Sequence, residues 1–291
     1  MARVCLLPNR SVFQISGPEA KSFLQDLLTN NLDLISPVRA IYTCLLTPQG
    51  KYLFDFFLME KDGAYLVDCD RDAAPLLLKR LMFYKLRADV QLRDFSDSWS
   101  VGSILGDEMD AGAARAFSEG VLFQDPRLAA LGARFLVPAE KMNEAIESIS
   151  GPTIDASEYE HHRLMLGVPG HEDLMPDKTF PMEANLDVLN AIDFHKGCFV
   201  GQEVTSRTYR QGKVRKRMLP VTCEGRLPPI GTPIMADDRQ AGELLSSQGN
   251  IGLALVRLDR LETPLTVDGA NIETRFPDWL PRLVADDAHE Y

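Results

Sequence analysis

The chain has 291 residues, of which 45% are hydrophobic and 25% charged. That length suits roughly two domains, and the apolar share is large enough for a packed core, which excludes a largely disordered chain. The net charge is −11, so the surface as a whole repels nucleic acid, and RNA could be bound only through a local basic patch.

The composition also bears on compartment and on metal sites. No apolar run approaches the roughly 20 residues that cross a bilayer, and the first residues lack a secretory signal, so we expect no membrane partner. The five cysteines are scattered and form no Cys-x-x-Cys, and the adjacent His161 and His162 of a predicted helix point about 100° apart. We therefore expect no disulfide framework, no metal site and a cytoplasmic location with reduced thiols.

The first third of the chain predicts strands with interspersed helices. Ser16-Gly17-Pro18-Glu19 follows a short strand and has the spacing of a capping box, which predicts a helix that ends at Asn30-Asn31. Thr47-Pro48-Gln49-Gly50 separates two strand-like runs, 41–46 and 51–59, and its Pro and Gly positions suit a type I turn. We therefore predict a β-hairpin at this point.

The rest of the chain divides near residue 216. Strands are expected at 63–69, 89–95, 99–105 and 134–137, with helices over 139–149 and 157–166. Strands and helices mix without regular βαβ alternation, which favours α+β. After Arg217 short β-rich runs alternate with Gly, Pro and Asp clusters, which predicts a small all-β barrel or sandwich.

One segment stands apart for its chemistry, residues 193–207. Gly197 and Gly201 allow close approach of backbone, and a lysine, a cysteine, an amide and a carboxylate lie between and around them. These residues alone leave two interpretations open: an anion or ligand site, and a tight turn that leads into a helix.

The segment Lys196-Gly197-Cys198-Phe199-Val200-Gly201-Gln202-Glu203 resembles the K-G-C-[FY]-x-G-Q-E signature of the YgfZ-like folate-binding proteins, relatives of the glycine-cleavage T-protein (aminomethyltransferase). Further similar segments are Ile15–Gln25, Leu46–Lys51, Tyr84–Arg87, Arg163–Pro169, Pro181–Leu186 and Val214–Arg217. These segments lie between about residues 10 and 257, so the resemblance covers most of the chain.

The resemblance implies a fold, a cofactor and a function. It implies intertwined ferredoxin-like α+β subdomains over residues 1–216, the aminomethyltransferase folate-binding region, and a C-terminal β-barrel over residues 217–291. It implies binding of tetrahydrofolate or a one-carbon derivative. It also implies a function in the assembly or repair of iron–sulfur client enzymes, including some that modify tRNA.

The resemblance also implies site residues. Glu183 is our first candidate for pairing with the donor edge of a reduced pterin, because one carboxylate can accept two parallel N–H bonds. The remaining candidates for cofactor binding are Arg163, Gly197, Gly201, Gln202, Glu203 and Arg207. A solvated loop glutamate and an ordinary surface ion pair are the plainer interpretations of Glu183 and Arg163.

The candidates for catalysis are Cys198, Lys196 and Asp55. Cys198 is either a small buried hydrophobe or a partly exposed thiol beside Lys196 and His195, whose positive charge favours a thiolate. We expect the other four cysteines to lie in the core.

Asp55 bears on whether the chain transfers one-carbon units. True aminomethyltransferases carry an acidic pair at the comparable place, and here Phe54 stands beside Asp55. A phenyl ring cannot accept a proton, which argues against transferase chemistry. An aminomethyltransferase of the T-protein type remains an alternative that needs Asp55 to act alone.

The third hypothesis is an RNA-associated binding module. Six cations fall between residues 207 and 217: Arg207, Arg210, Lys213, Arg215, Lys216 and Arg217. They predict either a solvated strand pair or a contact for an RNA backbone or a polyglutamate tail.

Overall fold

A computed structural model describes residues 2–106, 109–212 and 214–281. The chain forms two compact units, and neither is a continuous stretch of sequence. Unit 1 comprises residues 1–46, 53–159 and 189–200, and unit 2 comprises residues 47–52, 160–188 and 201–291. None of the described helices combines the length and the apolar composition that crossing a bilayer requires.

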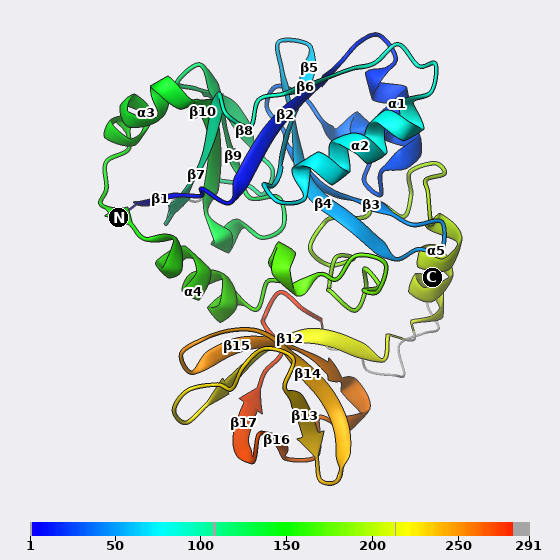
Figure 1. Ribbon diagram of the computed structural model, residues 1–291, viewed down its shortest axis with the longest axis vertical. Helices are drawn as coiled ribbons and strands as arrows, with labels where there is room; N and C mark the ends of the chain where they lie inside the picture. The colour runs from blue at the N-terminus through cyan, green and yellow to red at the C-terminus, as the bar shows by residue number, and fades with distance from the viewer. Residues whose placement is uncertain (1, 107–108, 213, 282–291) are drawn as a thin grey trace. The chain divides into compact units, whose positions relative to one another are not determined.

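Unit 1 contains a five-stranded sheet with helices packed on it (Figure 1). Its strand order is β3 (Ile41–Leu46), β4 (Tyr52–Lys61), β5 (Ala64–Asp70), β2 (Arg10–Ser16) and β6 (Gln91–Asp94). Helices α1 (Ala20–Leu27) and α2 (Ala74–Lys85) bury their apolar sides in one core with this sheet. Because almost every residue of β3 and β4 is buried, these two strands form the interior of the unit.

A second, six-stranded sheet completes unit 1. Its order is β11 (Thr153–Ile154), β1 (Arg3–Leu6), β7 (Trp99–Leu105), β10 (Ala133–Pro138), β9 (Gly120–Gln124) and β8 (Ala114–Phe117). Helix α3 (Met142–Ser148) packs on this sheet through Met142 and Ala145. Helix α4 (Ala156–Leu166) follows β11.

The C-terminal part of unit 2 is a closed six-stranded barrel, drawn in yellow to red in Figure 1. The order around the barrel is β12 (Lys216–Cys223), β15 (Ile251–Arg257), β14 (Arg239–Gln248), β13 (Pro233–Ala236), β16 (Leu265–Val267) and β17 (Ala270–Thr274). Closure leaves no free sheet edge, and its interior is filled by aliphatic side chains. The expected α+β class with a C-terminal β-barrel is confirmed.

The predicted hairpin is confirmed, and the residues of its turn belong to unit 2. The Gly50 N–H donates to the Thr47 carbonyl (2.8 Å), and Gly50 has a φ of +74°. A side chain at Gly50 would lie 3.1 Å from the Gly201 carbonyl oxygen, so the turn packs closely on the start of α5 (Gln202–Gln211).

Two local predictions are wrong. Ser16 does not cap α1: the helix begins at Ala20 without a side-chain cap, and the Glu19 carboxylate instead accepts the Asp89 N–H (2.6 Å). The cations between residues 207 and 217 are not a strand pair either. Their first part lies on α5, β12 begins only at Lys216, and Lys213 lies outside the described residues.

Candidate functional site

The loop that carries the signature cysteine is held to the end of α1 by Lys196. The side chain is buried, and its Nζ donates to the carbonyl oxygens of Gln25 (2.6 Å), Leu28 (2.6 Å) and Asn30 (2.9 Å). The last carbonyls of a helix lack partners within the helix, and a cation is favoured there by the helix dipole. Lys196 therefore caps α1 from a distant part of the sequence.

The ammonium of Lys196 is committed to this task. It has three N–H donors, and three carbonyls accept them. Burial lowers the pKa of Lys196 to about 8, against an opposing effect of Asp193 and two further aspartates. The ammonium also lies 5.6 Å from the centre of the Phe199 ring. Lys196 is thus a positioning residue for the loop, and its N–H donors, predicted for catalysis, are engaged by backbone carbonyls.

Cys198, two residues further on, is exposed. Cys5, Cys44 and Cys69 are buried, and burial raises the pKa of all three thiols, that of Cys5 to about 11. These three are neutral at physiological pH and shielded from solvent, whereas Cys198 can meet another molecule. Of the two interpretations of Cys198, a buried hydrophobe and an exposed thiol, the structure contains the second, while Cys223, expected in the core, is only half-buried.

The two glycines of the signature differ in their surroundings. A side chain at Gly197 would meet no described atom within 4 Å, so the backbone there is open. Gly201 has a φ of +84° and forms the N-cap of α5, where the Thr205 hydroxyl donates to its carbonyl (3.0 Å). Open backbone at Gly197 permits close approach by a ligand or partner, whereas Gly201 is required by the turn into the helix.

Gln202 and Glu203 of the signature, and the further candidate Arg207, belong to α5 in unit 2. Gln202 is half-buried, and Glu203 and Arg207 are exposed to solvent. Their assignment to cofactor binding stays a prediction. A ligand site and a turn leading into a helix were both open interpretations of this segment, and the structure contains the second.

Glu183 lies in an irregular segment that is fixed to the start of the barrel. Its carbonyl accepts the Met218 N–H (2.8 Å), and the Asn185 amide donates to the Met218 carbonyl (2.7 Å). Buried Arg217 forms a bidentate ion pair with Asp187 (2.6 and 2.9 Å). Within the described parts of the chain, the half-buried Glu183 carboxylate has no hydrogen bond or ion pair, so it is available to a ligand.

Arg163 is not available in this way. Its guanidinium is buried and donates to Glu160 (2.9 Å from Nε), to the Val168 carbonyl (2.6 Å), to Asp173 (2.9 Å) and to Glu172 (3.4 Å). A second contact with Glu160 uses the last of its five N–H donors. The predicted binding role of Arg163 therefore does not fit, and Arg163 instead holds together an acidic segment of unit 2.

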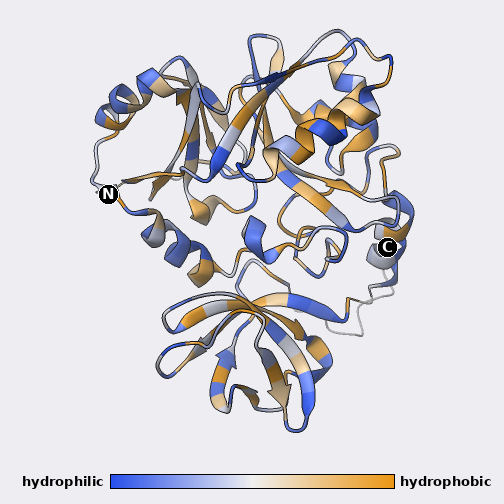
Figure 2. Cartoon of the chain, in the orientation of Figure 1, coloured by the Kyte–Doolittle hydropathy of each residue, from blue (hydrophilic) through white to orange (hydrophobic). Residues whose placement is uncertain are grey.

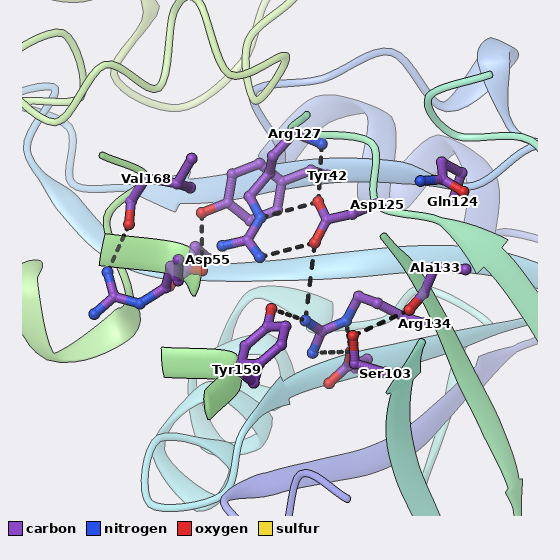
Figure 3. Close-up of polar contacts among 12 residues, drawn as sticks. Tyr42, Asp55, Ser103, Gln124, Asp125, Arg127, Ala133, Arg134, Tyr159 and Val168 are labelled. Carbon is purple, nitrogen blue, oxygen red and sulfur yellow. Dashed lines mark hydrogen bonds and ion pairs between the residues drawn. The ribbon is translucent and has the colours of Figure 1, made fainter. Parts of the chain in front are cut away.

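Asp55 is buried on β4 of unit 1 and accepts a hydrogen bond from the Tyr42 hydroxyl (2.9 Å; Figure 3). Burial and the neighbouring Asp55 raise the pKa of Tyr42 well above its usual value, which keeps the phenol protonated and donating. The Arg127 guanidinium lies over the Tyr42 ring (5.4 Å) and pairs with Asp125 through two hydrogen bonds (3.0 and 2.8 Å). Asp55 is thus part of a buried polar cluster.

This cluster joins the two sheets of unit 1. Asp68 on β5 accepts from Arg10 (2.6 Å) and from Arg134 on β10 (3.1 Å). The guanidinium groups of three arginines lie 4.5–5.6 Å from the centre of the Phe57 ring, namely Arg10, Arg127 and Arg134. This network was not predicted from the sequence. The segment Asp125-Pro126-Arg127, at the end of a buried strand, was a signal for a buried ion pair.

The comparisons with known proteins agree with this architecture. Over 96% of the chain, the structure matches the crystal structure of the glycine cleavage system aminomethyltransferase T from Bartonella henselae, covering 86% of that protein with a TM-score of 0.79. The identity is 14%, so this likeness shows the fold alone. Residues 215–282 match the family model of the CAF17 C-terminal beta-barrel domain. The chain is therefore a protein of the aminomethyltransferase fold with a CAF17-type barrel.

The relatives define the family more narrowly. The human mitochondrial iron–sulfur cluster assembly factor IBA57 is 34% identical over 95% of this chain and 85% of its own length. A homologue of that factor from Pyricularia oryzae is 36% identical over 90% of this chain and 73% of its length. The chain belongs to the IBA57 family. Because these relatives are mitochondrial, the cytoplasmic location predicted from the sequence is wrong.

Proposed function

We propose that this protein is an iron–sulfur cluster assembly factor that presents Cys198 to iron–sulfur client enzymes. Membership of the IBA57 family supports the process, and the exposed thiol on an anchored loop supports the residue. Thiolates are the usual protein ligands of iron–sulfur clusters, so an accessible cysteine is suited to a protein that meets a cluster or its acceptor.

A complementation experiment tests this function. In cells that lack the protein, the wild-type chain restores the activity of iron–sulfur enzymes per amount of enzyme protein. Cys198→Ser fails to restore it, and Cys223→Ser, a matched change of a half-buried cysteine in the barrel, succeeds. Equal restoration by both variants contradicts the function assigned to Cys198, and no restoration by the wild type contradicts the assembly function. Any effect on tRNA modification follows indirectly, through the clients.

The second part of the proposal is that the protein binds tetrahydrofolate, as the resemblance to YgfZ-like proteins implies. The supporting observation is the half-buried Glu183 carboxylate, which has no described partner although its backbone is fixed to β12. A free carboxylate of this kind can accept the paired N–H donors of a reduced pterin. When bound, the cofactor would supply one-carbon or redox chemistry, and Glu183 would orient its ring.

Calorimetric titration with tetrahydrofolate measures this binding directly. Glu183→Gln keeps the size but replaces one acceptor oxygen by a donor, so we expect at least a tenfold loss of affinity. Glu147→Gln, an exposed change on α3, is the control. The absence of wild-type binding refutes the cofactor, and unchanged affinity in Glu183→Gln refutes the assignment of this residue.

An aminomethyltransferase activity is the alternative that Asp55 leaves open. Asp55 accepts a hydrogen bond from the Tyr42 hydroxyl and is buried, which suits a structural acceptor at least as well as a group that assists one-carbon transfer. Release of a methylene group from an aminomethyl donor in the presence of tetrahydrofolate would establish the transferase. The RNA module has less support, because Arg217 is buried against Asp187 and cannot reach a nucleic acid backbone.

A further inference from the structure

The outward side of α2 carries an apolar patch that the fold does not use. Ala74, Leu77 and Leu81 of this helix are buried against the five-stranded sheet. On the other side, four large apolar side chains are 58–83% exposed, namely Leu76, Met82, Phe83 and Leu86, which we call the α2 patch. In Figure 2, α2 shows both strongly hydrophobic and strongly hydrophilic residues. Single exposed apolar residues are ordinary, but a group of neighbours marks an interaction site.

Leu86 is the most informative member of the α2 patch. It follows the last residue of α2 with a φ of +47° and a ψ of −106°, a positive-φ conformation outside the left-handed helical region that glycine adopts most easily. Its side chain is 83% exposed, so packing does not compensate for the strained backbone. Leu86 also lies in the Tyr84–Arg87 segment, one of those on which the family resemblance rests. The fold gains nothing from a leucine here, which points to a contact with another molecule.

The charges around the α2 patch indicate what kind of molecule this is. Lys79, Arg80 and Arg87 are exposed, and none of them forms an ion pair with the described residues. Residues three and four apart are neighbours on a helix, so Lys79 and Arg80 lie between Leu76 and Phe83. The patch is therefore apolar and cationic, although the whole chain carries a net charge of −11.

We propose that the α2 patch docks an acidic, amphipathic helical segment of a partner protein. Such a segment places aliphatic side chains on Leu76, Phe83 and Leu86 and carboxylates opposite Lys79 and Arg80. Methionine at position 82 adapts to different apolar shapes, which suits a surface that serves several partners. The surface belongs to unit 1 alone, and the proposal depends neither on tetrahydrofolate nor on Cys198.

Two other occupants fit less well. If the α2 patch inserted into a lipid bilayer, Lys79 and Arg80 would approach the acyl chains together with Leu76 and Phe83. Helices that lie on a membrane surface instead keep their cations on the polar side. In a second copy of this chain, Lys79 and Arg80 would face like charges across the symmetric interface.

The test uses the full chain and a synthetic 18-residue amphipathic helix with leucines on one face and glutamates beside them. A second peptide has lysine in place of every glutamate. Calorimetry measures both at low and at high salt, and co-sedimentation measures binding to phosphatidylcholine vesicles that contain phosphatidylglycerol. We expect the wild type to bind the acidic peptide, more weakly at high salt, and to prefer it at least tenfold over the basic one. The double variant Lys79→Glu with Arg80→Glu reverses this preference.

Apolar variants locate the site. Phe83→Ser weakens binding of the acidic peptide at least tenfold, whereas Ile230→Ser leaves it unchanged, although Ile230 is similarly exposed (68% against 70%). Leu86→Gly relieves the backbone strain, so it raises the urea midpoint of unfolding while it lowers the affinity for the peptide. A purely structural function of Leu86 predicts no loss of affinity.

Four results overturn the proposal. The first is that the wild type does not bind the acidic peptide, and the second is that Phe83→Ser and the wild type bind this peptide equally. The third is that the wild type binds vesicles but not the acidic peptide, and that Phe83→Ser abolishes the vesicle binding. The fourth is dimerisation of the wild type, seen in sedimentation, that Phe83→Ser abolishes, because it assigns the α2 patch to a second copy.

Discussion

Replacing Lys196 by methionine removes the bonds that tie the signature loop to α1 while keeping an apolar stem of similar length. The carbonyls of Leu28 and Asn30, two buried residues, lose the hydrogen bond that they accept from Lys196. The Gln25 carbonyl loses the third hydrogen bond of the Lys196 ammonium. We expect the free energy of unfolding to fall by about 2–4 kcal/mol, because a hydrogen bond to a charged group contributes about 1.5–3 kcal/mol and the relieved burial of the ammonium offsets part of the sum.

Tryptophan fluorescence can assign this loss to unit 1. The chain has two tryptophans, Trp99 on β7 of unit 1 and Trp279 in unit 2. In a Trp279→Phe background, urea unfolding followed by fluorescence reports on the surroundings of Trp99. Lys178→Met, at an exposed position of unit 2, is the control. An unchanged midpoint in Lys196→Met, or an equal fall in the control, refutes the anchoring function.

The pH dependence of this loss separates the charge of Lys196 from its shape. Burial gives the folded protein a pKa of about 8 at this site, against 10.5 for an ordinary lysine. Between these values the unfolded chain binds the proton and the folded chain does not, so the contribution of Lys196 to the free energy of unfolding rises with pH. The difference between wild type and Lys196→Met should therefore grow from pH 8 to pH 10. A constant difference contradicts a buried ammonium.

Three further predictions concern the rest of the site and the fold. Arg163→Met leaves neighbouring carboxylates uncompensated and should lower the free energy of unfolding by about 3–5 kcal/mol in urea, whereas an unchanged midpoint means that solvent already neutralises them. Gly120→Ala places a methyl group 1.8 Å from the Leu136 carbonyl oxygen, so we expect the free energy of unfolding to fall by about 1–3 kcal/mol or the variant not to fold. A thermal midpoint within error of the wild type refutes the close strand contact. Gly197→Ala meets no described atom, so it should keep wild-type stability; impaired restoration of iron–sulfur enzymes by this folded variant places a partner against the loop, and full restoration shows that none comes that close.

Local chemistry was enough to predict much of the fold. The strands at 41–46 and 99–105 are found at the predicted residues, because runs rich in aromatic, aliphatic and small residues end there at clear turn signals. The Thr47–Gly50 turn follows from proline and glycine at fixed offsets. Ser16 failed as a cap for a reason that lies 70 residues away, since Glu19 bonds to Asp89 instead of its own helix. Spacing identifies a motif that can cap a helix, but a distant acceptor or donor decides whether it does.

The buried contacts of unit 1 could not be predicted in the same way. Arg134 and Asp68 are 66 residues apart, and charged residues in strands normally indicate a solvent-facing side. Among the described residues the hydrogen-bond acceptors of Lys196 are backbone carbonyls, which every sequence contains, so no residue pattern indicates its partners. The family resemblance drew attention to Lys196, but its interpretation as a catalytic cation beside the thiol did not foresee that the ammonium is fully bonded elsewhere.

The contrast between Lys196 and Cys198 bears on how the protein acts. In an active site that closes over its substrate, exclusion of water around a nucleophilic cysteine strengthens the interactions that stabilise the transition state. Here the lysine is enclosed, while the cysteine is exposed and Gly197 beside it has open space around it. The loop is thus held firmly at one residue and presents the next ones to solvent. A thiol in this position depends on a second molecule to complete its surroundings, which suits transfer to or from a partner better than turnover of a small substrate by this loop alone.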